Sequence, residues 1–127
     1  MIVLKKYWIS TLIIIVILFL CFINPAEIPV DVPMTNFDKL AHFLMFMGLS
    51  GAIFFDNSYY LKKRVSVNLI FGVSFFFPIV FSGVIEIAQE YLTLTRTGDW
   101  MDFLFNVIGV SVGYLVCLVI NRKLKAQ

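Results

Sequence analysis

The chain has 127 residues, of which 61% are hydrophobic and 14% charged, and its formal net charge is +2. A soluble domain of this size exposes too much surface to carry so little charge, so the composition excludes a soluble globular protein. The length is near that of a single domain, and we expect one membrane domain over residues 1–127, with lipids and no nucleic acid as partners.

Four apolar segments predict an all-α fold, an integral membrane bundle of four transmembrane helices. A spanning helix needs about 20 residues, and in lipid each backbone amide must bond within its own segment. The segments are residues 7–23, 38–55, 67–92 and 102–120. Bulky Cys21, Phe22 and Ile23 stand where signal-peptide cleavage needs small residues, so the first helix is predicted to be retained. Gly109 and Gly113 form a close-packing motif rather than a site.

Prolines mark where the helices are interrupted. The first connection, residues 24–37, is predicted to be an extended loop because three prolines forbid a helix there. These are Pro25, Pro29 and Pro33. Pro78 lies near the middle of the third segment and predicts a kink or tilt. The connections over residues 56–66 and 93–101 are predicted to be short.

The basic residues predict the orientation of the bundle. With four spans, eight of the ten fall at the same end, which the positive-inside rule assigns to the cytoplasm together with both termini. They are Lys5, Lys6, Lys62, Lys63, Arg64, Arg122, Lys123 and Lys125. Lys39 and Arg96 are the two at the external end.

Polar residues gather at the external ends of three helices. Asp38 and His42, four residues apart, share a face of the second helix. Similar faces in the third and fourth helices carry Ser82, Glu86, Gln89 and Glu90, and Asp102 and Asn106. A rise of 1.5 Å per residue places His42, Glu86 and Asn106 roughly 6–9 Å below the helix ends. Ionisable groups cost about 2.5–3.5 kcal/mol each at the bilayer centre, so they are predicted to face inward and form a common site in the outer leaflet.

Simpler roles exist for several of these residues. Asp38 and Asp102 open their predicted helices, where a carboxylate caps free amides and suits the helix dipole. Asn106 is also suited to hydrogen bonding between helices. At its depth Glu86 can neither cap a helix nor extend its carboxylate to the membrane surface, which makes Glu86 the strongest candidate for a functional residue.

At these residues the sequence resembles the VanZ-like family of small bacterial membrane proteins. The resemblance covers about residues 10–120 and lies in the stretch from Asp38 to Phe46 and in Glu86-Ile87-Ala88-Gln89. It continues through Arg96, Asp99, Asp102, Asn106 and Gly109. It implies a multi-pass protein of the bacterial cytoplasmic membrane, an envelope role and a contribution to resistance against teicoplanin, a lipid-bearing glycopeptide antibiotic. It supplies no reaction.

The first functional hypothesis is a protein that binds or modifies an amphipathic envelope molecule in the outer leaflet. The ligand would be a lipid-linked cell-wall precursor or a glycopeptide antibiotic. Lys39 and Arg96 could hold a phosphate or carboxylate. The predicted substrate-binding residues are Asp38, Lys39, Gln89, Glu90, Arg96, Asp99, Asp102 and Asn106.

The second hypothesis is an enzyme acting on the same class of lipid. His42 and Glu86 would be its catalytic acid–base pair, with Arg96 stabilising an anion. The sequence shows no evident cofactor motif. A divalent metal such as Mg²⁺ is an alternative, held by Asp99, Asp102 and Glu90 against a pyrophosphate.

The third hypothesis is a proton-coupled transporter, because carboxylates with a histidine suit a proton relay. The inner half of the bundle offers few polar residues, namely Ser50, Ser74 and Ser111. A complete pathway would therefore need an oligomer, and we rank this hypothesis last. The sequence leaves the oligomeric state open.

Overall fold

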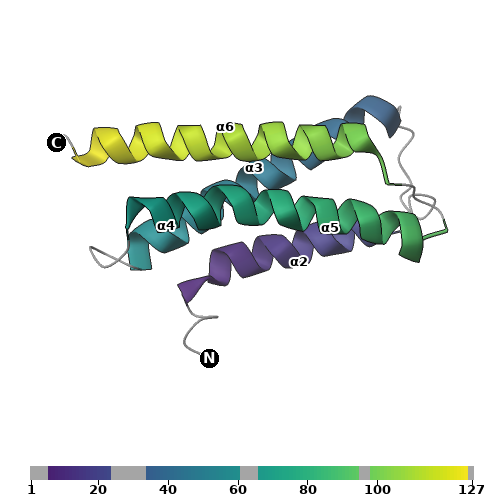
Figure 1. The fold of residues 1–127 in the computed structure, drawn as a ribbon, viewed down its shortest axis with the longest axis horizontal. Helices are drawn as coiled ribbons and strands as arrows, with labels where there is room; N and C mark the ends of the chain where they lie inside the picture. The colour runs from purple at the N-terminus through teal and green to yellow at the C-terminus, as the bar shows by residue number, and fades with distance from the viewer. Residues whose placement is uncertain (1–5, 24–33, 61–65, 95–97, 126–127) are drawn as a thin grey trace.

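The computed structural model describes residues 6–23, 34–60, 66–94 and 98–125 and shows an all-α protein, as predicted. Its elements are α2 (Trp8–Phe22), α3 (Met34–Tyr60), α4 (Val67–Phe71), η2 (Gly72–Phe76), α5 (Phe77–Leu92) and α6 (Trp100–Lys125). α4, η2 and α5 follow one another directly and form one long helix (Figure 1). The described segments thus form four helices and contain no strand.

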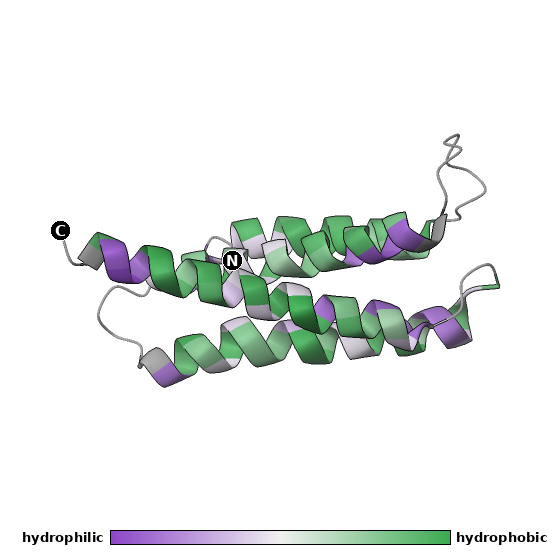
Figure 2. Cartoon of the chain, turned by 90° about the horizontal axis from the view of Figure 1, so that it is seen from above, coloured by the Kyte–Doolittle hydropathy of each residue, from purple (hydrophilic) through white to green (hydrophobic). Residues whose placement is uncertain are grey.

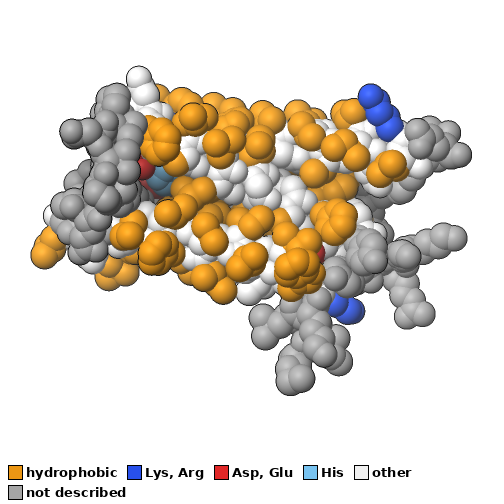
Figure 3. All heavy atoms as spheres, turned by 180° about the vertical axis from the view of Figure 1, so that it is seen from behind, with side chains coloured by type: hydrophobic (Ala, Val, Ile, Leu, Met, Phe, Trp, Pro, Cys, Tyr) orange, Lys and Arg blue, Asp and Glu red, His pale blue; other side chains and the backbone are white. Residues whose placement is uncertain are grey.

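The helices have the length and composition of membrane-spanning segments. Three of them are long and apolar enough to cross a bilayer: Asn36–Ser58, Asn68–Leu92 and Trp100–Leu124. The fourth, Trp8–Phe22, is apolar but shorter. Hydrophobic side chains cover the flank of the bundle in Figure 3, and hydrophilic residues concentrate toward its ends in Figure 2. These features are those of a helical membrane protein.

The four helices run side by side, with the start of α2 and the end of α6 toward the same end of the bundle (Figure 1). The opposite end holds the last turns of α2 and α5 and the first turns of α3 and α6. Buried apolar side chains from all four helices form the core between the ends. They are Ile17, Cys21, Phe46, Leu49, Ile53, Ile85 and Val110. That the end with the termini faces the cytoplasm remains a prediction.

Helix α3 is longer at both ends than we predicted. It begins at Met34, so the predicted extended loop over residues 24–37 was too long. A proline is compatible with the first turn of a helix, where its missing N–H costs no hydrogen bond, so Pro33 did not require the loop to continue. α3 also continues to Tyr60, and α6 runs from Trp100 to Lys125, because polar and basic residues extend both helices past their apolar stretches.

The end with the termini contains a buried carboxylate that we had placed in a loop. Asp56 is 1% exposed and lies within α3. Its Oδ2 accepts hydrogen bonds from the backbone N and the Oγ of Ser10, at 3.1 and 2.7 Å. Beside it, the hydroxyl of Tyr7 donates to Oδ1 of Asn57 at 2.7 Å. These bonds join α3 to the first helix.

Glycine residues allow α6 to lie against the backbone of α3. A Cβ atom at Gly109 would meet the carbonyl oxygen of Phe43, and one at Gly113 would meet that of Met47. The predicted close-packing motif is confirmed. Because this packing fixes α6 against the face of α3 that carries His42, it also positions the polar residues of both helices.

Pro78 is accompanied by a π-helical segment, η2, that ends two residues before it. Proline has no N–H for the carbonyl of Ser74, four residues earlier. The hydroxyl of Ser50 donates a hydrogen bond to this carbonyl at 2.9 Å. The disturbance that we predicted at Pro78 is therefore compensated by a side chain of α3.

We predict that Gly109→Ala destabilises the bundle by about 1–3 kcal/mol, because the new methyl group meets a backbone carbonyl that cannot rotate away. Gly48→Ala is the matched control, since a Cβ there meets nothing within 4 Å. The control should change stability by less than about 1 kcal/mol. Reversible unfolding in mixed micelles, followed by circular dichroism, measures both. Equal losses would contradict the close contact between α3 and α6.

We also predict that Ser50→Ala costs about 1–3 kcal/mol, because it leaves the carbonyl of Ser74 without its donor in an apolar surrounding. In a Pro78→Ala background the restored N–H can serve that carbonyl, and the same substitution should cost less. The four unfolding free energies form a double-mutant cycle. A coupling energy of zero would show that Ser50 does not compensate for the proline.

Candidate functional site

His42 lies at the centre of a polar cluster formed by α3, α5 and α6. The side chain is 1% exposed. Its Nδ1 atom is 3.1 Å from Oδ1 of Asn106 on α6 and 3.8 Å from Oε1 of Glu86 on α5. Glu86 is 8% exposed, and Asn106 is fully buried. The structure therefore brings together the three residues that the sequence places at a common depth.

The hydrogen bonds of this cluster determine the proton position on His42. Nδ2 of Asn106 donates to Oε1 of Glu86 at 3.4 Å, which leaves Oδ1 of Asn106 to accept from the imidazole. In neutral His42 the proton is consequently on Nδ1, and Nε2 has a free lone pair. Nε2 lies 3.9 Å from Oδ2 of Asp102. His42 contacts Asn106 directly, whereas its distance to Glu86 exceeds that of a hydrogen bond.

Lys39 is neutralised by two carboxylates. Its Nζ lies 3.1 Å from Oδ2 of Asp99 and 3.1 Å from Oδ1 of Asp102. We expected Lys39 and Arg96 to hold an anionic group of the ligand. Lys39 instead pairs with Asp99 and Asp102, and Arg96 lies outside the described residues.

Asp99 is the residue that caps α6, a role we had considered for Asp102. The helix begins at Trp100, and Oδ1 of Asp99 accepts from the backbone N of Met101 at 2.8 Å. This hydrogen bond, followed by that from Lys39, lowers the pKa of Asp99. Asp102 is in the first turn, where it suits the helix dipole. Asp38 lies one turn inside α3 and does not open that helix as we had expected.

Gln89 joins α5 to α2. It is buried, and its Nε2 donates to the carbonyl oxygen of Cys21 at 2.9 Å. This carbonyl belongs to the last turn of α2, where backbone acceptors have no partner within the helix. The hydrogen bond gives Gln89 a role in holding the helices together at this end, and a contact with a ligand remains a prediction.

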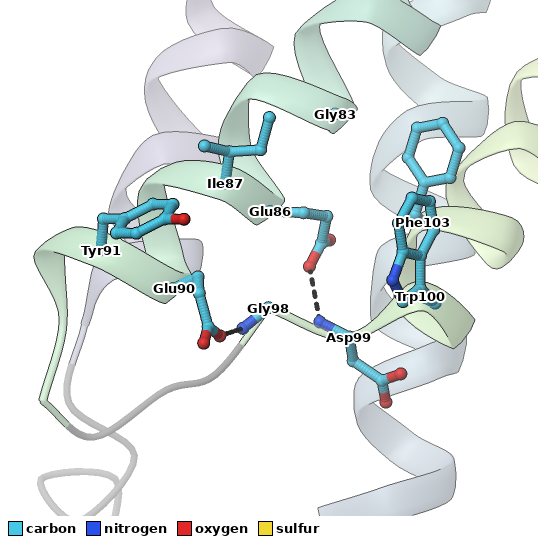
Figure 4. A pocket seen from close by; sticks show the side chains of 9 residues that line it. All are labelled: Gly83, Glu86, Ile87, Glu90, Tyr91, Gly98, Asp99, Trp100 and Phe103. Carbon is cyan, nitrogen blue, oxygen red and sulfur yellow. Dashed lines mark hydrogen bonds between the residues drawn. The ribbon is translucent and has the colours of Figure 1, made fainter.

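A cleft of about 520 Å³ lies between α5 and the start of α6 (Figure 4). Three acidic residues are among those that line it, Glu86, Glu90 and Asp99. Oε2 of Glu86 accepts from the backbone N of Asp99 at 3.2 Å, and Oε2 of Glu90 accepts from that of Gly98 at 2.9 Å. The remaining lining residues are Gly83, Ile87, Tyr91, Gly98, Trp100 and Phe103. We had not predicted these as site residues, because apolar side chains give no distinct signal in an apolar sequence.

A second grouping in the cluster could hold a metal ion. Asp38, His42 and Asp102 each offer a ligand atom, and these atoms all lie within 4.8 Å of one another. This differs from the set that we predicted for Mg²⁺, which combined Asp99 and Asp102 with Glu90. Asp99 and Asp102 both bind Lys39, and Glu90 binds the backbone of Gly98.

The fold and the cluster define a small multi-pass membrane protein with ionisable side chains gathered beneath one end of its helices. The family model VanZ/LLP1 matches residues 3–121. The chain therefore belongs to the VanZ/LLP1 family, as its resemblance implied. No curated protein and no solved structure matches it.

We predict that the charge of Asp99 stabilises the fold in a pH-dependent manner. Asp99→Asn keeps an oxygen that can cap α6 but removes the charge beside Lys39. The pKa of Asp99 is lower in the folded chain than the unfolded value of about 3.9. The contribution of the Asp99 charge to the stability of the fold is thus complete above the unfolded pKa, and it is lost as the pH falls through the folded pKa.

At neutral pH the wild type should be more stable than Asp99→Asn by less than about 1 kcal/mol, because the pair is partly exposed. Unfolding free energies of both proteins, measured from neutral pH to about pH 3, should converge in acid. A difference that grows on acidification would contradict the assigned pairing.

Proposed function

We propose that this membrane protein binds an amphipathic molecule of the bacterial envelope in the cleft between α5 and α6, at the external end of the bundle. The observation that carries the proposal is the composition of the cleft. Carboxylates lie at its base, and aromatic and aliphatic side chains form its walls. A ligand that combines polar groups with a hydrocarbon part matches both surfaces.

The base of the cleft favours ligands that donate hydrogen bonds. Glu86 and Glu90 each accept from the backbone through Oε2, and a carboxylate has capacity for further donors. Lys39, the cation described at this end, is already paired with Asp99 and Asp102. Hydroxyl, amide and ammonium groups therefore suit the described residues better than a phosphate does.

The walls of the cleft favour an apolar chain. Ile87, Tyr91 and Trp100 are exposed on the outside of the bundle, where a bilayer would surround them. Tyr and Trp are enriched where hydrocarbon meets the polar surface of a membrane. A ligand embedded in the outer leaflet could enter sideways, with its polar group against Glu86 and Glu90.

Binding agrees with the geometry better than catalysis or transport. His42 is buried, is held by Asn106 and is not among the residues that line the cleft, so an amphipathic ligand in the cleft does not contact its imidazole. Toward the other end, the fully buried side chains of Phe46 and Leu49 fill the core between His42 and Asp56. This packing supports neither an acid–base reaction of that ligand at His42 nor a proton pathway along the bundle.

Two amphipathic molecules are candidate ligands, teicoplanin and a lipid-linked cell-wall precursor. Both combine a hydrocarbon part with hydroxyl and amide groups, and the phosphate groups of the precursor would have to lie away from Glu86 and Glu90. The expected contribution of the family to teicoplanin resistance fits either ligand, since the protein could bind the drug itself or the precursor that the drug recognises.

The test is to fill the cleft. We predict that Gly83→Leu weakens binding of teicoplanin or of a lipid-linked wall precursor by at least about tenfold, equal to about 1.4 kcal/mol. Gly83 lines the cleft, and a larger side chain there would project toward Phe103. Val84→Leu is the matched control, because Val84 is 56% exposed and does not line the cleft.

Binding is measured with each protein reconstituted in nanodiscs, and circular dichroism checks that both variants are folded. Susceptibility of cells to teicoplanin should change with Gly83→Leu in the same direction as deletion of the gene. If wild type and Gly83→Leu bind both probes equally, or if neither probe binds the wild type, the cleft is not the binding site.

A further inference from the structure

We propose that Asp38, His42 and Asp102 form a binding site for one divalent metal ion, with zinc as the preferred ion. The site lies between α3 and α6 and is separate from the lining of the cleft. It does not depend on the proposed function, because its donor atoms and their partners argue for it on their own.

The spacing of the donor atoms suits metal ligands better than hydrogen-bond partners. Nε2 of His42 and Oδ2 of Asp102 are 3.9 Å apart, which is too long for a hydrogen bond. Two ligands on one tetrahedral zinc ion, each bonded at about 2.0–2.2 Å, lie roughly 3.4 Å apart. Asp38 provides the third donor within 4.8 Å of the others. Binding one zinc ion would require these separations, at most 4.8 Å, to close to about 3.4 Å.

The surroundings of His42 prepare its free nitrogen for a metal. Nδ1 donates to Asn106, and Asn106 is held in this orientation because its amide donates to Glu86. A histidine that binds a metal commonly donates its other ring N–H to an oxygen in this way, which fixes the tautomer and ring orientation. The arrangement leaves the Nε2 lone pair directed toward Asp102.

Asp102 is oriented for the same role by Lys39. The ammonium group binds Oδ1 at 3.1 Å, while Oδ2 is the atom nearer to His42. A ligating carboxylate is typically held by a hydrogen bond through its second oxygen. Both buried ligands thus have a partner on the side away from the proposed ion.

The donor set indicates the kind of metal. One imidazole nitrogen and two carboxylate oxygens suit zinc, with the fourth position open to water or another oxygen ligand. Mg²⁺ prefers six oxygen ligands and retains most of its water, so a site with a buried imidazole suits it poorly.

The test uses the full chain, purified in detergent with a tag that contains no histidine. His42 is the single histidine of the sequence, so any metal–imidazole signal belongs to it. Calorimetric titration of the metal-free protein with Zn²⁺ should give one ion per chain. X-ray absorption should show nitrogen and oxygen ligands at about 2.0 Å, with outer scattering from one imidazole. Mg²⁺ should fail to displace the zinc.

Substitutions distinguish the residues that bind the metal from the residue that orients His42 by a hydrogen bond. Asp38→Asn and His42→Gln should weaken Zn²⁺ binding by more than about 100-fold, and Asn106→Ala by about 10–100-fold. In the metal-free wild type, the ¹⁵N shifts of His42 should report a proton on Nδ1, and Asn106→Ala should remove this preference. Glu90→Gln is the control, because Glu90 lines the cleft without belonging to the triad.

The proposal is overturned if the folded wild type binds no stoichiometric Zn²⁺, or if zinc binding persists unchanged in both Asp38→Asn and His42→Gln. The wild-type titration decides the matter even if a variant fails to fold. The zinc-binding test and the ligand-binding test of the cleft have distinguishable outcomes, since Gly83→Leu should retain zinc binding and lose binding of the amphipathic ligand.

Discussion

The arrangement of the helices depends on one constraint, the unfavourable transfer of ionisable side chains into hydrocarbon. Glu86 and His42 sit in helices otherwise built to face lipid, and each is stable there because α6 supplies Asn106 between them. The amide satisfies the carboxylate on one side and the imidazole on the other. Asn106 therefore joins α3, α5 and α6 at one depth and limits how each can rotate about its own axis.

Close packing of the backbones makes that hydrogen bonding geometrically available. In lipid, helices associate through close contact rather than through the exclusion of water, and small residues permit the approach. Gly109 lies one turn after Asn106 and places α6 directly against the carbonyl of Phe43, the residue next to His42. The glycines and the polar cluster are consequently parts of one interface, and a change in either would move the other.

Much of the fold and part of the site follow from sequence because hydrocarbon imposes simple rules. Apolar length predicts the helices, and the cost of burial predicts that Glu86, His42 and Asn106 converge. Helix ends were less predictable. Pro33 suggested a longer loop, and the depth of Asp56 could not be inferred because its partner, Ser10, is an ordinary residue of an apolar segment.

Individual partners were also beyond prediction, since they depend on how the helices are rotated and displaced. Spacing could predict that Lys39 lies at the same end of the bundle as Asp99 and Asp102, but not that both carboxylates would bind it. The cleft is the clearest case. Its walls are aromatic and aliphatic side chains that differ from lipid-facing ones only in their tertiary position.

The bond between Asp56 and Ser10 has a consequence for the order in which the bundle assembles. Its two partners belong to the first two helices and are 46 residues apart, so they can meet as soon as that hairpin leaves the ribosome. By contrast, the hydrogen-bond partner of His42, Asn106, lies 64 residues later in the chain and is therefore synthesised much later. One end of the hairpin can thus form its hydrogen bonds between helices at insertion, while the other must wait in the translocon or at the interface until the C-terminal helix arrives.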